Sequence, residues 1–311
     1  MYKVLVTGNV RQEGLDIISP FTEMVHLPEP VDQKALAHHL CDADAVLHKM
    51  GRLDSEALQG QRRLKIIARH GVGLDLLDMD HIRSINIPVT ITLGVNSNAV
   101  AELAVAMMIY LIRQMGPARD SLCHHKIWNR EAFMGLDLKD QTVGLMGLGG
   151  IGKRVTELLS VFGTRLLVHD PYVTEKQSNI ELVSLTELFG NSDIISLHCP
   201  LSSQTRNLIN PTNIDQLKDG FYLINTARGG IIDEDFLVQM VKSGKIAGAA
   251  LDAFASEPPD YDHELFTLEN VLCIPHIGAM STSAQIGMAI GAAKEIERVL
   301  SLKKPPEHLV F

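Results

Sequence analysis

Cysteine is scarce in this sequence of 311 residues and is not arranged for cross-linking. The four cysteines are Cys41, Cys123, Cys199 and Cys273, and they lie far apart in the chain. Paired, closely spaced cysteines mark structural zinc sites, whereas scattered cysteines are typical of reduced thiols in a cytosolic protein. We therefore expect no disulfide bonds, no metal site and a location in the cytoplasm.

The chain also has fewer basic than acidic residues. The chain has 28 Lys and Arg against 37 Asp and Glu, a formal net charge of −9, and its basic residues form no long block. Nucleic acids and anionic membrane surfaces attract proteins through clustered positive charge. The composition therefore predicts neither nucleic acid nor a membrane as a partner.

Long apolar runs are missing as well. The longest apolar stretch, residues 99–112, contains Glu102 and is shorter than the roughly 20 residues that span a bilayer. The first three residues lead directly into Val4, so no secretory or transit segment is expected. A chain of this length, 46% hydrophobic, predicts two globular domains.

Short runs rich in Val, Ile and Leu alternate with longer segments of helical period along the whole chain. This alternation is typical of parallel sheets covered by helices on both faces, so the fold class is predicted as α/β with two doubly wound parallel-sheet domains. The expected strands are residues 3–6, 45–48, 66–69 and 89–91 in the first part, and 142–146, 165–169, 193–197, 221–225, 247–251 and 271–274 in the second.

Two helices stand out. Residues 99–112, with Asn98 as the expected N-cap, are apolar nearly all round, which predicts burial between domains or in a subunit interface. Residues 281–300 form a final helix that we expect to pack back on the first domain.

A glycine-rich loop follows the strand at residues 142–146. Gly147, Gly149 and Gly152 have the GxGxxG spacing, which permits a tight turn and lets backbone N–H groups approach a pyrophosphate at a helix N-terminus. Asp170 ends the next strand, where a carboxylate accepts from both ribose hydroxyls and repels a 2′-phosphate. The arrangement predicts a dinucleotide site that prefers NAD to NADP.

Polar residues follow four further strands at the point where each strand ends: His198, the segment Asn225 to Arg228, Asp252 and His276. The carboxyl ends of parallel strands share one edge of the sheet, and ligands bind there in doubly wound folds. Each residue alone could be a cap or a turn residue, but together they predict a site at this edge.

Four segments resemble the ordered signatures of the D-2-hydroxyacid dehydrogenase family: residues 147–152, 225–233, 249–259 and 275–278. Residues 96–102 and 133–135 further match its phosphoglycerate dehydrogenase branch. The resemblance implies a Rossmann NAD-binding domain, residues 98–283, inserted into a flavodoxin-like substrate domain made of residues 1–97 and 284–311. It also implies a homodimer. Because the chain ends at Phe311, we expect no appended regulatory domain.

The resemblance also implies the catalytic residues. His276 would exchange a proton with the substrate oxygen, Glu257 would fix the tautomer of His276 and raise its pKa, and Arg228 would bind the substrate carboxylate and carbonyl. Lys49, His48, Val72, Gly73, Arg228 and His276 are the expected substrate-binding residues, with domain closure completing the site. The expected cofactor-binding residues are Gly147, Gly149, Gly150, Ile151, Gly152, Asp170, His198, Cys199, Pro200, Thr226, Ala227, Arg228, Asp252, His276, Gly278 and Ala279.

Some positions have a plain alternative or depart from the family. Glu257 precedes two prolines and could lie in a surface turn, while His276 could be structural. Many relatives carry Arg where this chain has Gly150, which removes one side-chain contact to the pyrophosphate. His48 and Lys49 stand where phosphoglycerate enzymes place Arg and Ser. A substrate phosphate would have to meet Lys49, or Arg130 from a partner subunit.

The first hypothesis is an NAD-dependent dehydrogenase that converts 3-phosphoglycerate to 3-phosphohydroxypyruvate in serine biosynthesis. The alternative within the same chemistry is a reductase of glyoxylate, hydroxypyruvate or another small 2-keto acid, favoured if His48 and Lys49 form no phosphate pocket. From a different class, an NAD-sensing binding module similar to the corepressors of this family would keep the fold without turnover.

Overall fold

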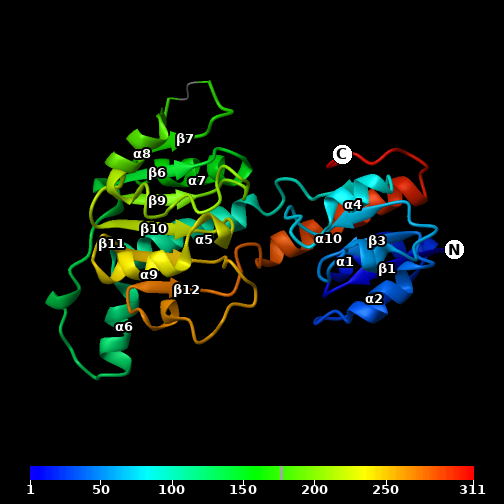
Figure 1. Ribbon diagram of the computed structural model, residues 1–311, viewed down its shortest axis with the longest axis horizontal. Coiled ribbons are helices and arrows are strands. Elements are labelled where there is room, and N and C mark those ends of the chain that lie inside the picture. Colours follow the sequence, from blue (N-terminus) through cyan, green and yellow to red (C-terminus); the bar gives the residue numbers. More distant parts are fainter. Residues whose placement is uncertain (176–177) are drawn as a thin grey trace. The chain divides into compact units, whose positions relative to one another are not determined.

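The computed structural model describes residues 1–175 and 178–311, which form two compact units (Figure 1). Unit 1 consists of Met1–Asn96 with Met280–Phe311, and unit 2 of Ser97–Ala279. The chain therefore leaves unit 1 after Asn96 and returns to it at Met280. The boundaries expected from the sequence, after residues 97 and 283, lie one and four residues further along the chain.

Unit 1 contains a parallel five-stranded sheet in the order β2-β1-β3-β4-β5. The strands are β1 (Tyr2–Thr7), β2 (Thr22–Leu27), β3 (Ala45–His48), β4 (Ile67–Arg69) and β5 (Val89–Thr90). The helices are α1 (Gln12–Ile18), α2 (Gln33–Leu40), α3 (Ser55–Leu58), α4 (Met79–Ser84) and α10 (Thr282–Leu300).

Alternate residues of the unit 1 strands enter two separate cores, as a sheet covered on both faces requires. Leu5, Val46 and Ile67 pack in one core with residues of α2, α3 and α4. Val4 and Leu47 pack in the other with residues of α1 and α10. The final helix therefore covers the sheet of the first part of the chain, which confirms the expectation for this helix.

Unit 2 contains a parallel seven-stranded sheet in the order β12-β11-β10-β9-β6-β7-β8. The strands are β6 (Thr142–Met146), β7 (Arg165–His169), β8 (Glu181–Leu182), β9 (Ile194–Leu197), β10 (Phe221–Asn225), β11 (Ile246–Leu251) and β12 (Val271–Cys273). The helices are α5 (Ser97–Ile112), α6 (Met115–Cys123), α7 (Gly150–Ser160), α8 (Leu185–Asn191) and α9 (Glu234–Lys242). The reversal of strand order between β6 and β9 is a topological switch point.

The predicted α/β class with two parallel sheets is confirmed, and every predicted strand is present within one residue at each end. Two strands were missed, β2 and β8. Each lies at an edge of its sheet, and β2 carries the exposed side chains Glu23 and His26. Edge strands are half solvated, so they lack the continuous apolar run that marks a buried parallel strand.

The apolar helix α5 begins at Ser97, so Asn98 lies inside it and does not act as the N-cap. The Asn98 side chain instead donates to Glu102 at 2.6 Å and accepts from Nε of Arg154 in α7 at 2.7 Å. The buried side of α5 packs on α7 and β10, so the core of unit 2 accounts for much of its apolar character.

No single helix among residues 1–175 and 178–311 is long and apolar enough to cross a membrane. Helices α5 and α6 satisfy the criteria of length and hydropathy only as a pair, which is bent by 62°.

Candidate active site

The glycine-rich loop joins β6 to α7 and depends on its glycines for two close approaches. Gly147 has a φ of +96°, and a Cβ there would lie 2.9 Å from the carbonyl oxygen of His198. A Cβ on Gly152 would lie 2.2 Å from the carbonyl oxygen of Gly147. No atom of the described residues lies within 4 Å of the corresponding position on Gly149. The first turn of α7 therefore offers backbone N–H groups beside open space, as anion binding at a helix N-terminus requires.

Asp170 directly follows β7 and lies at the same edge of the sheet as the glycine loop. Its Oδ2 accepts from the backbone N–H of Leu148 at 2.7 Å, and its Oδ1 accepts from the N–H of Tyr172 at 2.9 Å. A carboxylate has about four acceptor positions, so each oxygen keeps capacity for a further donor such as a ribose hydroxyl. Asp170 thus both holds the glycine loop and remains able to accept from a dinucleotide.

Two buried polar atoms at the ends of β9 and β10 lack a hydrogen-bond partner among the described residues. They are Nδ1 of His198 and Oγ1 of Thr226. The other ring nitrogen of His198 lies 2.9 Å from Oγ of Ser196, and burial lowers the pKa of His198 to about 4, so the ring is neutral. Buried polar atoms usually find a partner, and these two are placed to meet one supplied by a ligand. The residues fit a dinucleotide at this edge.

Cys199 and Cys273 are partly buried, and all four cysteines are free thiols. Burial raises the pKa of Cys199 to about 11 and that of Cys273 to about 12. Both are therefore protonated at neutral pH and are not nucleophiles.

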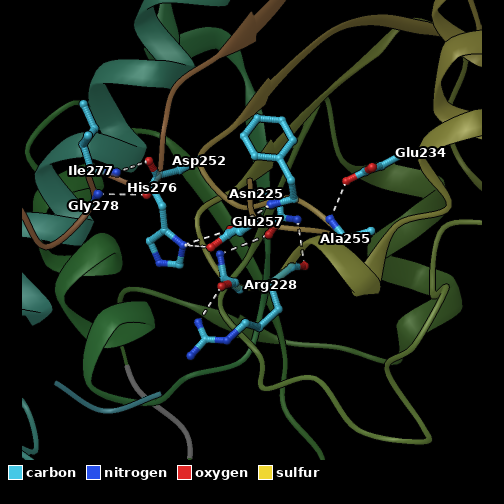
Figure 2. A network of polar contacts seen from close by, with 11 residues as sticks. Asn225, Arg228, Glu234, Asp252, Ala255, Glu257, His276, Ile277 and Gly278 are labelled. Carbon is cyan, nitrogen blue, oxygen red and sulfur yellow. Dashed lines mark hydrogen bonds and ion pairs between the residues drawn. The ribbon is translucent and has the colours of Figure 1, made fainter. Parts of the chain in front are cut away.

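Asn225 at the end of β10 shapes the loop that carries Arg228. Its side-chain oxygen accepts from the N–H of Ala227 at 3.0 Å, and its side-chain nitrogen donates to the carbonyl of Arg228 at 2.9 Å (Figure 2). Gly229 then passes so close to the next loop that a Cβ there would lie 1.9 Å from the carbonyl carbon of Phe254. The backbone of Arg228 is therefore held by the side chain of Asn225 before it and by the close packing of Gly229 after it.

The His276 ring and the Glu257 carboxylate face each other (Figure 2). Nδ1 of His276 lies 2.7 Å from Oε2 and 2.9 Å from Oε1 of Glu257, and Oε1 also accepts from the N–H of Phe254 at 3.1 Å. The two side chains are 47% and 39% exposed, so solutes can reach the pair. Because Nδ1 is held by the carboxylate, Nε2 is the nitrogen left for a substrate.

His276 and Glu257 shift each other's pKa. The hydrogen bond to Glu257 raises the pKa of His276 above its ordinary value, although burial acts in the opposite direction. Burial opposes ionisation of Glu257, but the hydrogen bond and charge of His276, the N–H of Phe254 and the charge of Arg228 together outweigh it, so the pKa of Glu257 lies below its usual range. The positive charge of Arg228 acts on both groups, lowering each pKa. His276 therefore stays protonated over a wider range than a free histidine.

Asp252 at the end of β11 holds the backbone beyond His276. Its carboxylate is buried and accepts from the N–H of Ile277 at 2.6 Å and of Gly278 at 2.8 Å (Figure 2). Burial raises the pKa of Asp252, while these two N–H groups act against the rise. His276 has a φ of +50°, an unusual value for a residue with a side chain. The hydrogen bonds that Asp252 accepts stabilise this conformation and so orient the ring.

The expected substrate side chains of unit 1 are already engaged there. His48 is fully buried, and its ring contacts the carbonyl of Gly51 and the guanidinium of Arg69, so no ring nitrogen remains for a substrate. Nζ of Lys49 donates to the carbonyl of Asn9 at 2.8 Å and lies 3.5 Å from Oε1 of Glu29. The His48 ring and the Lys49 ammonium group thus both have partners within unit 1, and their contacts with a substrate stay a prediction.

Within unit 2 the structure brings together Arg228, Glu257 and His276, which come from three separate loops. Val72 and Gly73 lie in unit 1, in the loop after β4. The side chain of Arg69 was not among the residues predicted from the sequence. An arginine at the last position of an otherwise buried strand was a signal that could have found it.

The profile of the D-isomer specific 2-hydroxyacid dehydrogenase, NAD binding domain, matches residues 105–278. Hydroxypyruvate reductase from Thermotoga maritima is 36% identical over 97% of this chain and 99% of that protein. D-3-phosphoglycerate dehydrogenase from Archaeoglobus fulgidus is 34% identical over 94% of this chain but only 56% of its own length.

Solved structures agree with these relatives. The TT0316 protein from Thermus thermophilus superposes with a TM-score of 0.91 at 33% identity, covering 99% of this chain and all of that one. NAD-dependent formate dehydrogenase from Staphylococcus aureus, solved in complex with NAD, superposes with a TM-score of 0.90 at 26% identity, covering 99% of each chain. The prediction of NAD as cofactor is confirmed, and with this fold, glycine loop and coverage the chain belongs to the NAD-dependent D-isomer specific 2-hydroxyacid dehydrogenases.

Proposed function

We propose that this protein is an NADH-dependent reductase of a small unphosphorylated 2-keto acid, such as hydroxypyruvate or glyoxylate, and forms the D-2-hydroxy acid. The observation that carries the reaction type is the contact of 2.7 Å between Nδ1 of His276 and Oε2 of Glu257, which leaves Nε2 of a protonated ring accessible. A protein that only sensed NAD would have no use for a proton donor at this place.

The glycine loop and Asp170 would hold the dinucleotide, which would supply hydride to the carbonyl carbon or accept it in the reverse direction. The carbonyl oxygen gains negative charge as the hydride arrives, and Nε2–H of His276 donates its proton to that oxygen. Glu257 keeps the proton on Nδ1 and stabilises the positive ring beforehand. The guanidinium of Arg228 binds the carboxylate and the carbonyl with its paired N–H groups. In oxidation the same groups work in reverse, with neutral His276 as the base.

The choice of substrate rests on the neighbours of Lys49. Its ammonium group is bound to the Asn9 carbonyl and lies beside Glu29, and its side chain is 15% exposed. His48 is buried and its pKa is lowered to about 3 by burial, so it carries no charge for a phosphate. These observations favour an unphosphorylated acid over 3-phosphoglycerate and reverse the order in which the sequence ranked them. Similarity to a hydroxypyruvate reductase and, at 35% identity, to a glyoxylate reductase from Thermofilum pendens supports the same choice.

Oxidation of D-3-phosphoglycerate, as in serine biosynthesis, is the second candidate. Its support is the similarity to D-3-phosphoglycerate dehydrogenases from Archaeoglobus fulgidus, Synechocystis and Methanocaldococcus jannaschii at 34–35% identity. It requires that Lys49 leave Glu29, or that Arg130 of a second copy meet the phosphate.

A homodimer is part of the proposal. The segment after α6 exposes large apolar side chains, among them Ile127, Trp128 and Met134, with 78% of Trp128 accessible. Exposed apolar groups gathered on one segment are typical of a surface that another protein chain covers. The cytoplasmic location expected from the sequence also remains a prediction.

Initial rates test the proposal. NADH-dependent reduction of hydroxypyruvate, glyoxylate and 3-phosphohydroxypyruvate is compared at equal concentrations, beside oxidation of D-3-phosphoglycerate by NAD and by NADP at alkaline pH. We expect the largest kcat/KM with an unphosphorylated acid. A clear preference for the phosphorylated pair would reject the substrate choice and leave the reaction type in place. Loss of turnover in His276→Ala with NADH binding retained is the expected control, and unchanged turnover would reject the assigned proton donor.

A further inference from the structure

Arg69 occupies the last position of β4, and its side chain binds backbone carbonyls in the loop after β4 and at the end of β3. Its Nε donates to the carbonyl of Gly73 at 2.8 Å. Its Nη1 donates to the carbonyl of His48 at 3.2 Å and to that of Lys49. One guanidinium therefore joins the segment after β3 to the segment after β4, which a planar group with five N–H donors is suited to do.

His48 completes this connection from the end of β3. Its Nδ1 lies 3.3 Å from Nη1 of Arg69, and its Nε2 lies 2.7 Å from the carbonyl of Gly51. A guanidinium only donates, so Nδ1 must be the acceptor and Nε2 must carry the hydrogen that Gly51 accepts. The fully buried ring is thus held in a single neutral tautomer. We call these two side chains and their bonds the Arg69–His48 clasp.

Through Gly73, the clasp contacts the loop after β4, which contains backbone N–H groups without a hydrogen bond among the described residues. Gly71 has a φ of +133°, and the loop is held to the segment after β5 because the N–H of Gly71 donates to Oγ1 of Thr92 at 3.0 Å. The N–H of Thr92 donates back to the carbonyl of Gly71 at 3.0 Å. Beyond this point, the N–H groups of Val72 and Gly73 make no hydrogen bond to any residue within 1–175 or 178–311, and both residues are partly exposed.

We propose that Arg69 and His48 are positioning residues, which never touch the substrate but hold the N–H groups of Val72 and Gly73 ready for its carboxylate. The inference rests on the proposed function, because it assumes that this loop binds a 2-keto acid. N–H groups fixed in advance need no ordering when the anion binds, so the clasp strengthens binding of ground state and transition state alike. Its loss therefore raises KM and leaves kcat nearly unchanged.

The test compares Arg69→Gln, Arg69→Lys, His48→Leu and His48→Gln with the wild-type enzyme, using whichever 2-keto acid the wild type reduces fastest. Arg69→Gln and His48→Leu should raise KM for the keto acid roughly tenfold or more, keep kcat within about threefold, and leave the Kd of NADH within about twofold. His48→Gln retains one donor and one acceptor and should restore most of the loss. Arg69→Lys should be intermediate, because one ammonium group cannot reach all the carbonyls.

Arg62→Gln is the matched control, since Arg62 is an exposed arginine of the same unit. A merely structural role for the clasp would lower Tm and the active fraction, and so kcat, without moving KM. An unchanged KM in Arg69→Gln and His48→Leu, or an equal rise in Arg62→Gln, would overturn the proposal. Should Arg69→Gln fail to fold, the comparison of His48→Leu with His48→Gln decides. Wild-type substrate preference tests the proposed function separately, because the ratio of variant to wild-type KM does not depend on which acid is preferred.

Discussion

Nδ1 of His276 lies 2.7 Å from Oε2 of Glu257, although the two residues belong to loops that follow different strands of unit 2. This contact raises the pKa of His276 and leaves the other ring nitrogen available. The proposed proton transfer and its pH dependence both depend on this contact.

Replacing Glu257 should move the pH profile of ketone reduction. The carboxylate raises the pKa of His276, so the protonated ring required for reduction persists to higher pH in the wild type. In Glu257→Gln the decline of kcat/KM with rising pH should begin at lower pH, and activity near pH 8 should fall by roughly ten- to hundredfold. The measurement is kcat/KM for reduction across the pH range. A profile that keeps its upper limb in place would show that Glu257 does not tune His276.

Replacing Asp170 should weaken the discrimination between cofactors. A carboxylate at this position accepts from ribose hydroxyls and repels a 2′-phosphate. In Asp170→Asn the ratio of kcat/KM for NADH to that for NADPH should fall by roughly tenfold, since a charge repulsion worth about 1.4 kcal/mol changes such a ratio by that factor. The amide oxygen can still accept from Leu148, which limits damage to the loop. Asp215→Asn, at an exposed position of the same unit, serves as the control, and an equal change there would refute the assignment.

Gly149→Ala separates cofactor binding from stability. The φ of Gly149 is −69°, and no atom of the described residues lies within 4 Å of its Cβ position, so the alanine fits the protein. We expect a Tm within about 2 °C of the wild type and a Kd for NADH at least about tenfold higher, because the methyl group occupies the approach of the pyrophosphate. Calorimetric titration with NADH measures the second quantity. Unchanged affinity would mean that the pyrophosphate does not approach this turn.

Three histidines with lowered pKa values should make the protein sensitive to acid. Burial lowers the pKa of His48 to about 3 and the pKa of both His70 and His198 to about 4. Between about pH 4 and 6.5 the unfolded chain binds these protons and the folded chain does not, so the free energy of unfolding falls as pH falls. From pH 7 to pH 5 each such histidine should cost about 2 kcal/mol.

Urea unfolding at the two pH values checks this expectation. His48→Gln removes one of the three groups, so its stability deficit relative to wild type should shrink by about 2 kcal/mol at pH 5. His125→Gln, at an exposed histidine, should show no such change. A deficit that stays constant between the two pH values would mean that His48 does not remain neutral in the folded protein.

Local sequence was sufficient for most of the strands and for the glycine loop between β6 and α7. Strands such as β6 and β10 are buried on both faces and therefore appear as continuous apolar runs. Because parallel strands place their carboxyl ends at one edge, His198, Asp252 and His276 could be assigned to a common site without coordinates. The missed strand β2 shows the limit of this reasoning, since an edge strand has too little buried surface to leave a clear pattern.

The sequence by itself determined the fold class and the glycine loop, since these depend on periodicity and spacing within short segments, and its resemblance to a known family pointed to the residues that we propose for the reaction. Only the tertiary structure decided what Lys49 and His48 do. Lys49 meets Asn9 and Glu29, and His48 meets Arg69, all of them distant in sequence. Whether such a side chain is available to a ligand depends on which groups, distant in sequence, the folded sheet brings beside it. Local sequence patterns contain no information about those neighbours.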